Sequence, residues 1–365
     1  MKKIYFFVNH SLGELDSIFP LIQKISFKNK KKVVIIFTVK NIYNDYLKNK
    51  FYLFVTKKLN IKIQLSYIPN KFDINLKSTK YLKLKVLFYN FILLLKNFFF
   101  LQAKYFLFEH SDSRYVTFSI KKLSKLLKLN IYVFQHGQSF NQKSSSITKK
   151  NKSNLIFLLF DNINLEFAKN LGYKKFITIG FPKFYTDWIN LLKDYNKSKI
   201  KIVTIFTREP FHKYYLTPKI YKELLINSYE SIRSQLGNIK IVLKPHPREK
   251  LEYINQIIKD NQFTNIKISH EHAGILSAQS EFTISFWCST ILDSLSLGVP
   301  SVEYFIENEN FRLLEPKGSL YKFYHIHSVD NKNDLKNFIH DAIENKYILP
   351  SIIKRFKIVP NFELV

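Results

Sequence analysis

Short apolar segments of strand length alternate along this chain with longer amphipathic segments of helix length. This alternation predicts repeating β–α units, which form parallel sheets with helices packed on their faces. In the first half the predicted strands cover residues 4–8, 33–39, 61–67, 105–108, 131–134 and 155–159. Ser11 and Glu14 have the spacing of a capping box and predict that a helix begins directly after the first strand.

A second series of β–α units begins after the polar segment 193–199. Its predicted strands cover residues 200–206, 239–243, 266–269, 282–285 and 301–304. We therefore expect an α/β protein of two doubly wound, Rossmann-like domains that face a central cleft, with ligands bound beyond the carboxyl ends of the strands. The expected domains span residues 1–190 and 200–345, and residues 346–365 are expected to pack back on the N-terminal domain as a tail.

The composition is that of a globular protein. The chain has 365 residues, of which 46% are hydrophobic and 23% are charged, and Cys288 is its single cysteine. Collagen-like, disordered and disulfide-stapled chains are excluded, and a reducing compartment is expected. The apolar stretch at residues 4–8 is too short for a signal peptide, and no apolar run reaches the roughly 20 residues of a membrane span. We expect a cytoplasmic protein without a transmembrane helix.

Positive charge is concentrated in the first half. The formal net charge is +29, and residues 1–150 hold 28 Lys and Arg residues against 6 Asp and Glu residues. Such a surface attracts an anionic polymer or an anionic membrane face. The alternative is that the excess of lysine, together with abundant Asn, Ile and Phe, reflects nucleotide bias in the genome and no binding function. The lysines are scattered and no compact nucleic-acid-binding motif is present, so no nucleic-acid partner is expected.

The segment from Lys244 to Arg248 reads Lys-Pro-His-Pro-Arg and directly follows a predicted strand. The two prolines prevent a simple helical continuation. An imidazole and two cations are thereby presented at the strand's carboxyl end, which suits a diphosphate or a phosphate leaving group. A surface turn with incidental charges is the alternative.

Ser289 and Thr290 stand between another predicted strand and a helix. Hydroxyl groups and backbone amides at such a helix start favour anion binding, although the same pair could simply cap the helix. Asp293, one turn further on, is placed to accept a hydrogen bond from a donor sugar or to sit on a polar helix face. Arg208, after the first strand of the second series, is a further candidate phosphate contact.

Two loops of the first half carry candidate bases. His136 follows a strand and could act as a general base, and Glu14 follows the first strand, where it could accept a proton or cap the helix. Gly13 and Gln138, beside these residues, are expected to contact the acceptor. Neither pair of closely spaced histidines, at 270 and 272 or at 325 and 327, has further ligands at metal-site spacing, so we expect no metal and no cofactor.

Four segments of the sequence together resemble the GT-B transferases of bacterial surface polysaccharides. They are His136-Gly137, Gly180-Phe181-Pro182-Lys183, the Lys-Pro-His-Pro segment, and Ser289-Thr290 before a helix that ends in Leu-Gly-Val-Pro. Within that group the chain looks most like the capsule sialyltransferases and 3-deoxy-manno-octulosonic acid (Kdo) transferases, and like the CDP-glycerol glycerophosphotransferases.

The resemblance implies roles for single residues. His246 matches the His-Pro histidine that contacts the donor phosphate, with Lys244 and Arg248 beside it, and Ser289 and Thr290 match the hydroxyl pair that holds the same phosphate. His136 matches the histidine proposed as the base in glycerophosphotransferases. Glu14 instead resembles the amino-terminal glutamate used by octulosonic acid transferases, which leaves the choice of base open.

The expected protein is a metal-independent, nucleotide-sugar-dependent glycosyltransferase of capsule or lipopolysaccharide synthesis. It would move a sialic-acid-like or Kdo-like sugar from a CMP-activated donor to an anionic or lipid-linked glycan, with peripheral contact to the cytoplasmic face of the inner membrane. Three alternatives stay open: a CDP-glycerol-type polyol-phosphate transferase, an isomerase like UDP-N-acetylglucosamine 2-epimerase, and a non-enzymatic protein that binds anionic polymers.

Overall fold

The structure is a computed structural model of the whole chain. It describes residues 3–9, 11–29, 32–65, 88, 103–109, 130–134, 155–162, 165–196, 201–210, 216–247, 249–309 and 320–358. The chain divides into two compact units, and the division falls between Trp188 and Ile189, inside helix α7 (Thr186–Tyr195). Within the described residues, no helix combines the length and the apolar character needed to cross a membrane.

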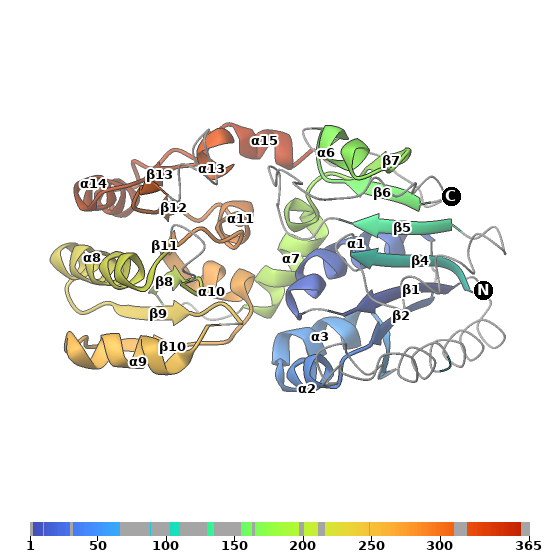
Figure 1. Ribbon diagram of the computed structural model, residues 1–365, viewed down its shortest axis with the longest axis horizontal. Helices are drawn as coiled ribbons and strands as arrows, with labels where there is room; N and C mark the ends of the chain where they lie inside the picture. Colours follow the sequence, from blue (N-terminus) through green and yellow to red (C-terminus); the bar gives the residue numbers. More distant parts are fainter. Residues whose placement is uncertain are drawn as a thin grey trace. The chain divides into compact units, whose positions relative to one another are not determined.

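The first unit contains a seven-stranded sheet with the order β3-β2-β1-β4-β5-β6-β7 (Figure 1). Every neighbouring pair is parallel. The strands are β1 (Lys3–Val8), β2 (Lys32–Phe37), β3 (Lys62–Leu65), β4 (Ala103–Glu109), β5 (Asn130–Phe134), β6 (Leu155–Leu159) and β7 (Lys175–Thr178). The order reverses at β1, which lies between β2 and β4, so the loop that carries Glu14 opens at the switch point of this sheet.

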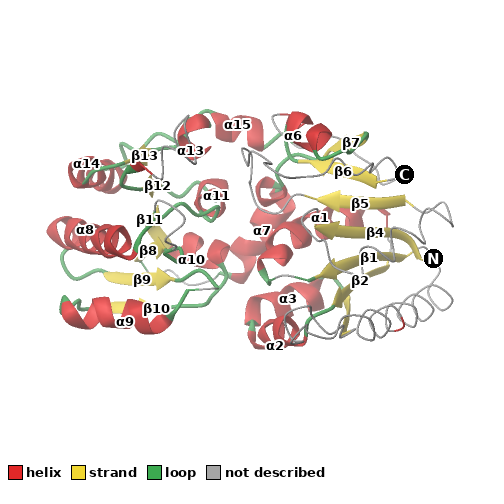
Figure 2. Ribbon diagram, viewed as in Figure 1, coloured by secondary structure: helices red, strands yellow, loops and turns green. Residues whose placement is uncertain are grey.

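The helices described between the strands of this unit follow β1, β2 and β6 (Figure 2). They are α1 (Gly13–Asn29), α2 (Lys40–Lys48), α3 (Lys50–Lys58) and α6 (Leu165–Asn170). After β7, Gly180 takes a positive φ of 75°, which a side chain would disfavour, and the chain turns into the short 3-10 helix Pro182–Phe184 that packs against α1.

The second unit contains a six-stranded parallel sheet with the order β10-β9-β8-β11-β12-β13. Its strands are β8 (Ile202–Phe206), β9 (Lys240–Lys244), β10 (Ile266–Ile268), β11 (Ser280–Ser285), β12 (Ser301–Tyr304) and β13 (Ser328–Val329). Its helices are α8 (Pro218–Leu236), α9 (Leu251–Asp260), α10 (Ala273–Gln279), α11 (Ile291–Ser296), α13 (Leu320–Phe323), α14 (Lys332–Ile343) and α15 (Ile352–Phe356). Here the order reverses between β8 and β11.

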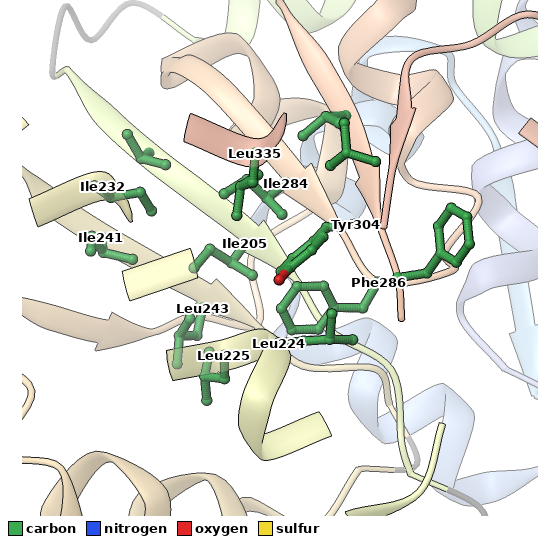
Figure 3. Close-up of a cluster of buried hydrophobic side chains, with 14 of the residues drawn as sticks. Ile205, Leu224, Leu225, Ile232, Ile241, Leu243, Ile284, Phe286, Tyr304 and Leu335 are labelled. Atoms are coloured by element: carbon green, nitrogen blue, oxygen red, sulfur yellow. The ribbon is translucent and has the colours of Figure 1, made fainter. Parts of the chain in front are cut away.

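One face of this second sheet is covered by a large apolar core. Figure 3 shows side chains of β8, β9, β11 and β12 meeting Leu224, Leu225 and Ile232 of α8 and Leu335 of α14. Full burial of one such side chain contributes about 1.5–3 kcal/mol. Tyr304 places its hydroxyl where Asn227 Nδ2 donates a hydrogen bond of 3.0 Å, so this aromatic side chain is buried without an unsatisfied hydroxyl.

All eleven predicted strands are present, which confirms the α/β class and the two β–α series. Two strands were missed, β7 and β13, and both lie at the edge of their sheets. β13 has only two residues, and an edge strand of this length carries too few apolar residues to give a signal.

Residues 346–358 pack within the second unit. The Tyr347 ring lies 5.6 Å from that of Phe338, and the Phe356 ring lies 5.5 Å from that of Tyr324. The expected tail on the N-terminal domain therefore does not include these residues, because their aromatic side chains are already packed against α14 and its neighbours. Residues 359–365 lie outside the described residues.

Candidate functional site

The second face of the second sheet carries many polar side chains, which is unusual for a buried parallel sheet. Successive side chains of a strand point to opposite faces, so the residues that alternate with the apolar core share this face. Its polar residues include Thr204, Lys244, Thr283, Ser285, Ser301 and Glu303. Ile202 and Val242 form a small apolar cluster on the same face with Leu276 of α10. Helices α10 and α11 cover this face.

The buried hydroxyls of this face bond to one another. Thr283 Oγ1 lies 2.9 Å from Ser294 Oγ and 2.6 Å from Ser301 Oγ, and Ser277 Oγ lies 2.8 Å from Ser294 Oγ. Further along, Ser328 Oγ donates to Glu303 Oε2 at 2.8 Å. A layer of hydrogen-bonded polar side chains thus runs beneath α11 toward the carboxyl edge of the sheet.

The predicted donor-binding residues follow three neighbouring strands at this edge. Arg208 follows β8, Lys244 ends β9 and is followed by His246, and Ser289 and Thr290 follow β11. Backbone hydrogen bonds extend the sheet past its last regular residues: Thr207 N donates to Lys244 O at 3.1 Å, and Phe286 N donates to Phe206 O at 2.9 Å. The structure therefore brings these loops to one edge, at the switch point between β8 and β11.

Arg208 is held against Trp287. The guanidinium carbon lies 4.2 Å from the centre of the indole ring, and Nη1 donates to Trp287 O at 3.1 Å. Trp287 takes a φ of 47°, in the left-handed region that costs a non-glycine residue about 1–3 kcal/mol. The bond from Arg208 helps to hold this strained turn, and the turn in exchange fixes the cation at the sheet edge.

Glu249 organises the loop that carries His246. Its Oε2 accepts hydrogen bonds from Thr207 Oγ1 at 2.7 Å and from His246 N at 2.9 Å, and its Oε1 accepts from the Tyr221 hydroxyl. The residue is only 8% exposed. Burial raises the pKa of Glu249, an effect that the hydrogen bonds from Tyr221, Thr207 and His246 oppose.

The start of α11 differs from the expected anion site. The amides of Ile291, Leu292 and Asp293 donate to the carbonyl groups of the three residues before Ile291, at 3.3, 3.2 and 3.0 Å, so the first turn already uses them. What this start offers is hydroxyl groups: Thr290 Oγ1 is buried and has no hydrogen-bond partner in the described structure. Asp293 is 2% exposed, so it does not sit on an exposed polar face of the helix.

Several polar side chains gather around Tyr321, which is buried. Burial is the main cause that raises the pKa of the Tyr321 hydroxyl; Cys288, Glu303 and Asp293 add to the rise, and Arg208 opposes it. These four residues therefore lie within electrostatic reach of one neutral phenol.

Glu249, Glu303 and Tyr321 were not predicted from the sequence. For Glu303 a signal existed, because a charged residue alternates with apolar ones in the strand Ser-Val-Glu-Tyr. Arg248, the remaining predicted donor contact, lies outside the described residues.

In the first unit Glu14 closes the loop between β1 and α1. Asn9 N lies 3.2 Å from both carboxylate oxygens, and Ser11 N donates to Oε1 at 3.1 Å. Glu14 is 3% exposed. The bond from the Ser11 amide to the Glu14 carboxylate is one of the two hydrogen bonds of a capping box, and this part of the prediction is confirmed. The carboxylate that was a candidate base is engaged by backbone donors.

Asp16, also in the first turn of α1, accepts a hydrogen bond of 2.5 Å from the Tyr52 hydroxyl. Gly13 is the exposed first residue of α1, where a β-carbon would lie 3.3 Å from Ser11 Oγ. His136 and Gln138 lie outside the described residues. In the part of the chain that is described, no group of three or more His, Cys, Asp and Glu side chains is placed to hold a metal ion.

No protein-family model matches this chain, and no curated protein matches it. Solved structures do. A glycosyltransferase from Rickettsia africae ESF-5 is 14% identical, with 98% of this chain and 92% of that chain covered and a TM-score of 0.54. The UDP-GlcNAc 2-epimerase of Methanocaldococcus jannaschii is 13% identical, with 96% and 93% covered and a TM-score of 0.57.

A third similar structure is HepE from Anabaena, crystallised with UDP and glucose. It is 11% identical, with 98% of this chain and 94% of that chain covered and a TM-score of 0.55. Each likeness extends over nearly the whole chain, and at these identities it shows the fold alone. The chain therefore has the GT-B fold of two Rossmann-like units that these glycosyltransferases and epimerases share.

Proposed function

We propose that this protein is a nucleotide-sugar-dependent glycosyltransferase whose donor nucleotide binds to the second unit. One observation supports the proposal: the segments that carry Arg208, Lys244 with His246, and Ser289 with Thr290 follow three neighbouring strands at the switch point of a parallel sheet. Crevices at such points are where open α/β sheets bind ligands. Cations beside hydroxyl groups are the chemistry that recognises a phosphate.

The roles follow from the chemistry of glycosyl transfer. When the acceptor oxygen attacks the sugar carbon, the bond to the donor phosphate breaks and negative charge grows on the leaving oxygen. Arg208, Lys244 and His246 would stabilise that charge, Arg248 would add to it, and Ser289 and Thr290 would donate hydrogen bonds. Asp293 would accept from a hydroxyl of the donor. Because side chains supply the positive charge, we propose transfer that needs no metal ion.

On the acceptor side we assign the general base to His136. Glu14 is the weaker candidate because its two oxygens accept from the amides of Asn9 and Ser11, which suits a residue that shapes the acceptor loop. Gly13 and Gln138 would contact the acceptor. The excess of lysine in residues 1–150 suits an anionic or lipid-linked glycan and peripheral contact with an anionic inner membrane surface, as in capsule or lipopolysaccharide synthesis.

Two donor classes are proposed in order. A CMP-linked acidic sugar of the sialic-acid or Kdo type comes first, on the motif resemblance, and a CDP-linked polyol phosphate is its variant. A UDP-linked sugar comes second, because HepE was crystallised with UDP and glucose. The similarity to UDP-GlcNAc 2-epimerase supports one alternative reaction, epimerisation of a UDP-sugar, which would proceed without any acceptor.

The test is a thermal-shift series with CMP, CDP, UDP, GDP and ADP on the wild type, on His246→Ala and on His340→Ala. A ligand that binds only the folded state increases the free energy of unfolding by mass action, by about 2.7 kcal/mol when its concentration is 100 times Kd. The melting temperature rises as a result. We expect stabilisation by a pyrimidine nucleotide that His246→Ala loses. His340→Ala, on the exposed face of α14, should keep it. A nucleotide effect that survives in His246→Ala, or no effect at all, would contradict the proposed donor site.

A further inference from the structure

The backbone of His246 is unusually constrained. Pro245 and Pro247 have no N–H group, so His246 supplies the one backbone donor of this three-residue turn. That amide donates to Glu249 Oε2 at 2.9 Å, and the His246 carbonyl accepts from Glu249 N at 2.8 Å. Glu249 therefore binds both backbone groups of His246.

The same carboxylate reaches the neighbouring loop. Glu249 Oε2 also accepts from Thr207 Oγ1 at 2.7 Å, and Thr207 directly precedes Arg208. Tyr221, fully buried in α8, donates its hydroxyl to Glu249 Oε1. One side chain thus connects helix α8, the loop after β8 and the loop after β9.

We propose that Glu249 is a positioning residue of the phosphate site, which fixes the loop of Arg208 and the loop of His246 relative to each other. This inference rests on the proposed function, because it assigns Glu249 to the donor site described above. Glu249 would not touch the nucleotide; it would act through the backbone of His246 and through Thr207. A loss of about 1 Å in the placement of such groups can cost about 100-fold in activity.

Three variants separate geometry from charge. In Glu249→Gln the amide oxygen can accept from Thr207 and His246 while the amide nitrogen donates to the Tyr221 oxygen, so the bonded shape survives without the charge. Glu249→Asp keeps the charge and withdraws the carboxylate by one methylene, about 1.5 Å. Glu249→Ala removes all three acceptor contacts. Ile241→Val, at the other end of β9, is the matched control for mild loss of core packing in the same strand.

Two measurements are made on each full-length variant. Hydrogen exchange of the His246 amide, without ligand, reports on the loop itself: we expect at least about tenfold faster exchange in Glu249→Ala and Glu249→Asp, and little change in Glu249→Gln and Ile241→Val. Calorimetric titration with CMP, with CDP and with UDP reports on the site. Glu249→Ala and Glu249→Asp should bind the nucleotide that binds the wild type at least about tenfold more weakly. Glu249→Gln and Ile241→Val should bind it with a Kd within about threefold of the wild-type value.

The outcomes are distinct. If Glu249→Asp exchanges its loop amide faster and still binds nucleotide as the wild type does, the positioning role is overturned while the proposed function stands. If Glu249→Gln loses affinity as fully as Glu249→Asp does, keeping the bonded shape does not preserve nucleotide binding, and the positioning role is again overturned. If the wild type binds none of CMP, CDP and UDP in this titration, the proposed function fails together with the phosphate role. Slow exchange of the His246 amide in Glu249→Ala would show that Glu249 does not hold this loop and would overturn the positioning role itself.

Discussion

The replacement Arg208→Lys should weaken both the fold and nucleotide binding. Lysine keeps the positive charge, but it cannot lie flat on Trp287 and donate to its carbonyl group at the same time. The charged hydrogen bond contributes about 1.5 kcal/mol at the low end of its range, and stacking of a partly exposed cation adds about 0.5–1 kcal/mol. We therefore expect a loss of about 2 kcal/mol in the free energy of unfolding, which for a unit of this size lowers the melting temperature by about 4–8 °C.

The matched control is Arg233→Lys. Arg233, near the C-terminal end of α8, has similar contacts. Its guanidinium carbon lies 4.9 Å from the ring centre of Tyr229, and its Nη1 donates to Gly237 O and Ile239 O at 2.8 and 2.7 Å. Those carbonyls precede β9, whereas Arg208 follows the carboxyl end of β8. Both variants should unfold at lower temperature.

Nucleotide affinity separates the two variants. Arg208→Lys should raise the Kd of the bound nucleotide by about tenfold, or 1.4 kcal/mol, and Arg233→Lys should leave it unchanged in calorimetric titration. An equal loss of affinity in both variants would mean that general destabilisation, and not the placement of the Arg208 cation, explains the effect. That result would refute the assignment of Arg208 to the phosphate site.

Three further predictions follow from the polar contacts. Glu14→Gln should retain most of the turnover rate, since glutamine keeps an acceptor for the loop amides of Asn9 and Ser11. His136→Ala should lose most of that rate. A severe loss of turnover in Glu14→Gln alone would assign the general base to Glu14. Burial raises the pKa of Glu249, so the folded state binds the carboxyl proton more tightly than the unfolded state does. The free energy of unfolding therefore falls as the pH rises from about 4.5 through the raised pKa, because ionisation favours the unfolded state. The melting temperature of Glu249→Gln relative to wild type should therefore increase over that range, and a relative decrease would reverse the argument. Thr283→Val should lower the free energy of unfolding in urea by about 1–3 kcal/mol, because Ser294 and Ser301 lose a buried hydrogen-bond partner. Thr283→Ser should lower it clearly less. Equal losses in the two variants would show that the hydrogen bonds of the polar layer contribute nothing to stability.

Much of the fold was predictable because most strands carry a short run of apolar or alternating apolar residues that the sequence displays locally. The edge strands β7 and β13 were missed, although the opposite edges β3 and β10 were predicted: β13 has only two residues, and β7 holds only two apolar ones. In the second unit, the loops that meet at the switch point follow from the order β9-β8-β11, and parallel strands necessarily place their carboxyl ends together. The motifs after β8, β9 and β11 could therefore be assigned to one edge from the sequence.

The contacts that organise the site were not predictable in the same way. Glu249 directly follows the Lys-Pro-His-Pro-Arg segment, yet its partners Thr207 and Tyr221 come from residues 42 and 28 positions away. Glu14 and Asp16 are both acidic residues in the first turn of α1. Glu14 accepts from the local amide of Ser11, whereas Asp16 accepts from Tyr52, 36 positions away. Such choices depend on tertiary neighbours that no local pattern contains.

The most direct test of a nucleotide site in the second unit uses Cys288, the single cysteine of the chain, which lies between Trp287 and Ser289 and is partly exposed. The rate of its alkylation by iodoacetamide is measured with and without the nucleotide that stabilises the protein, and in His246→Ala as the control. The account predicts that bound nucleotide slows alkylation several-fold in the wild type and not in His246→Ala. Alkylation at an unchanged rate, under conditions where calorimetry shows the nucleotide to be bound, would place the nucleotide elsewhere and contradict the proposed site.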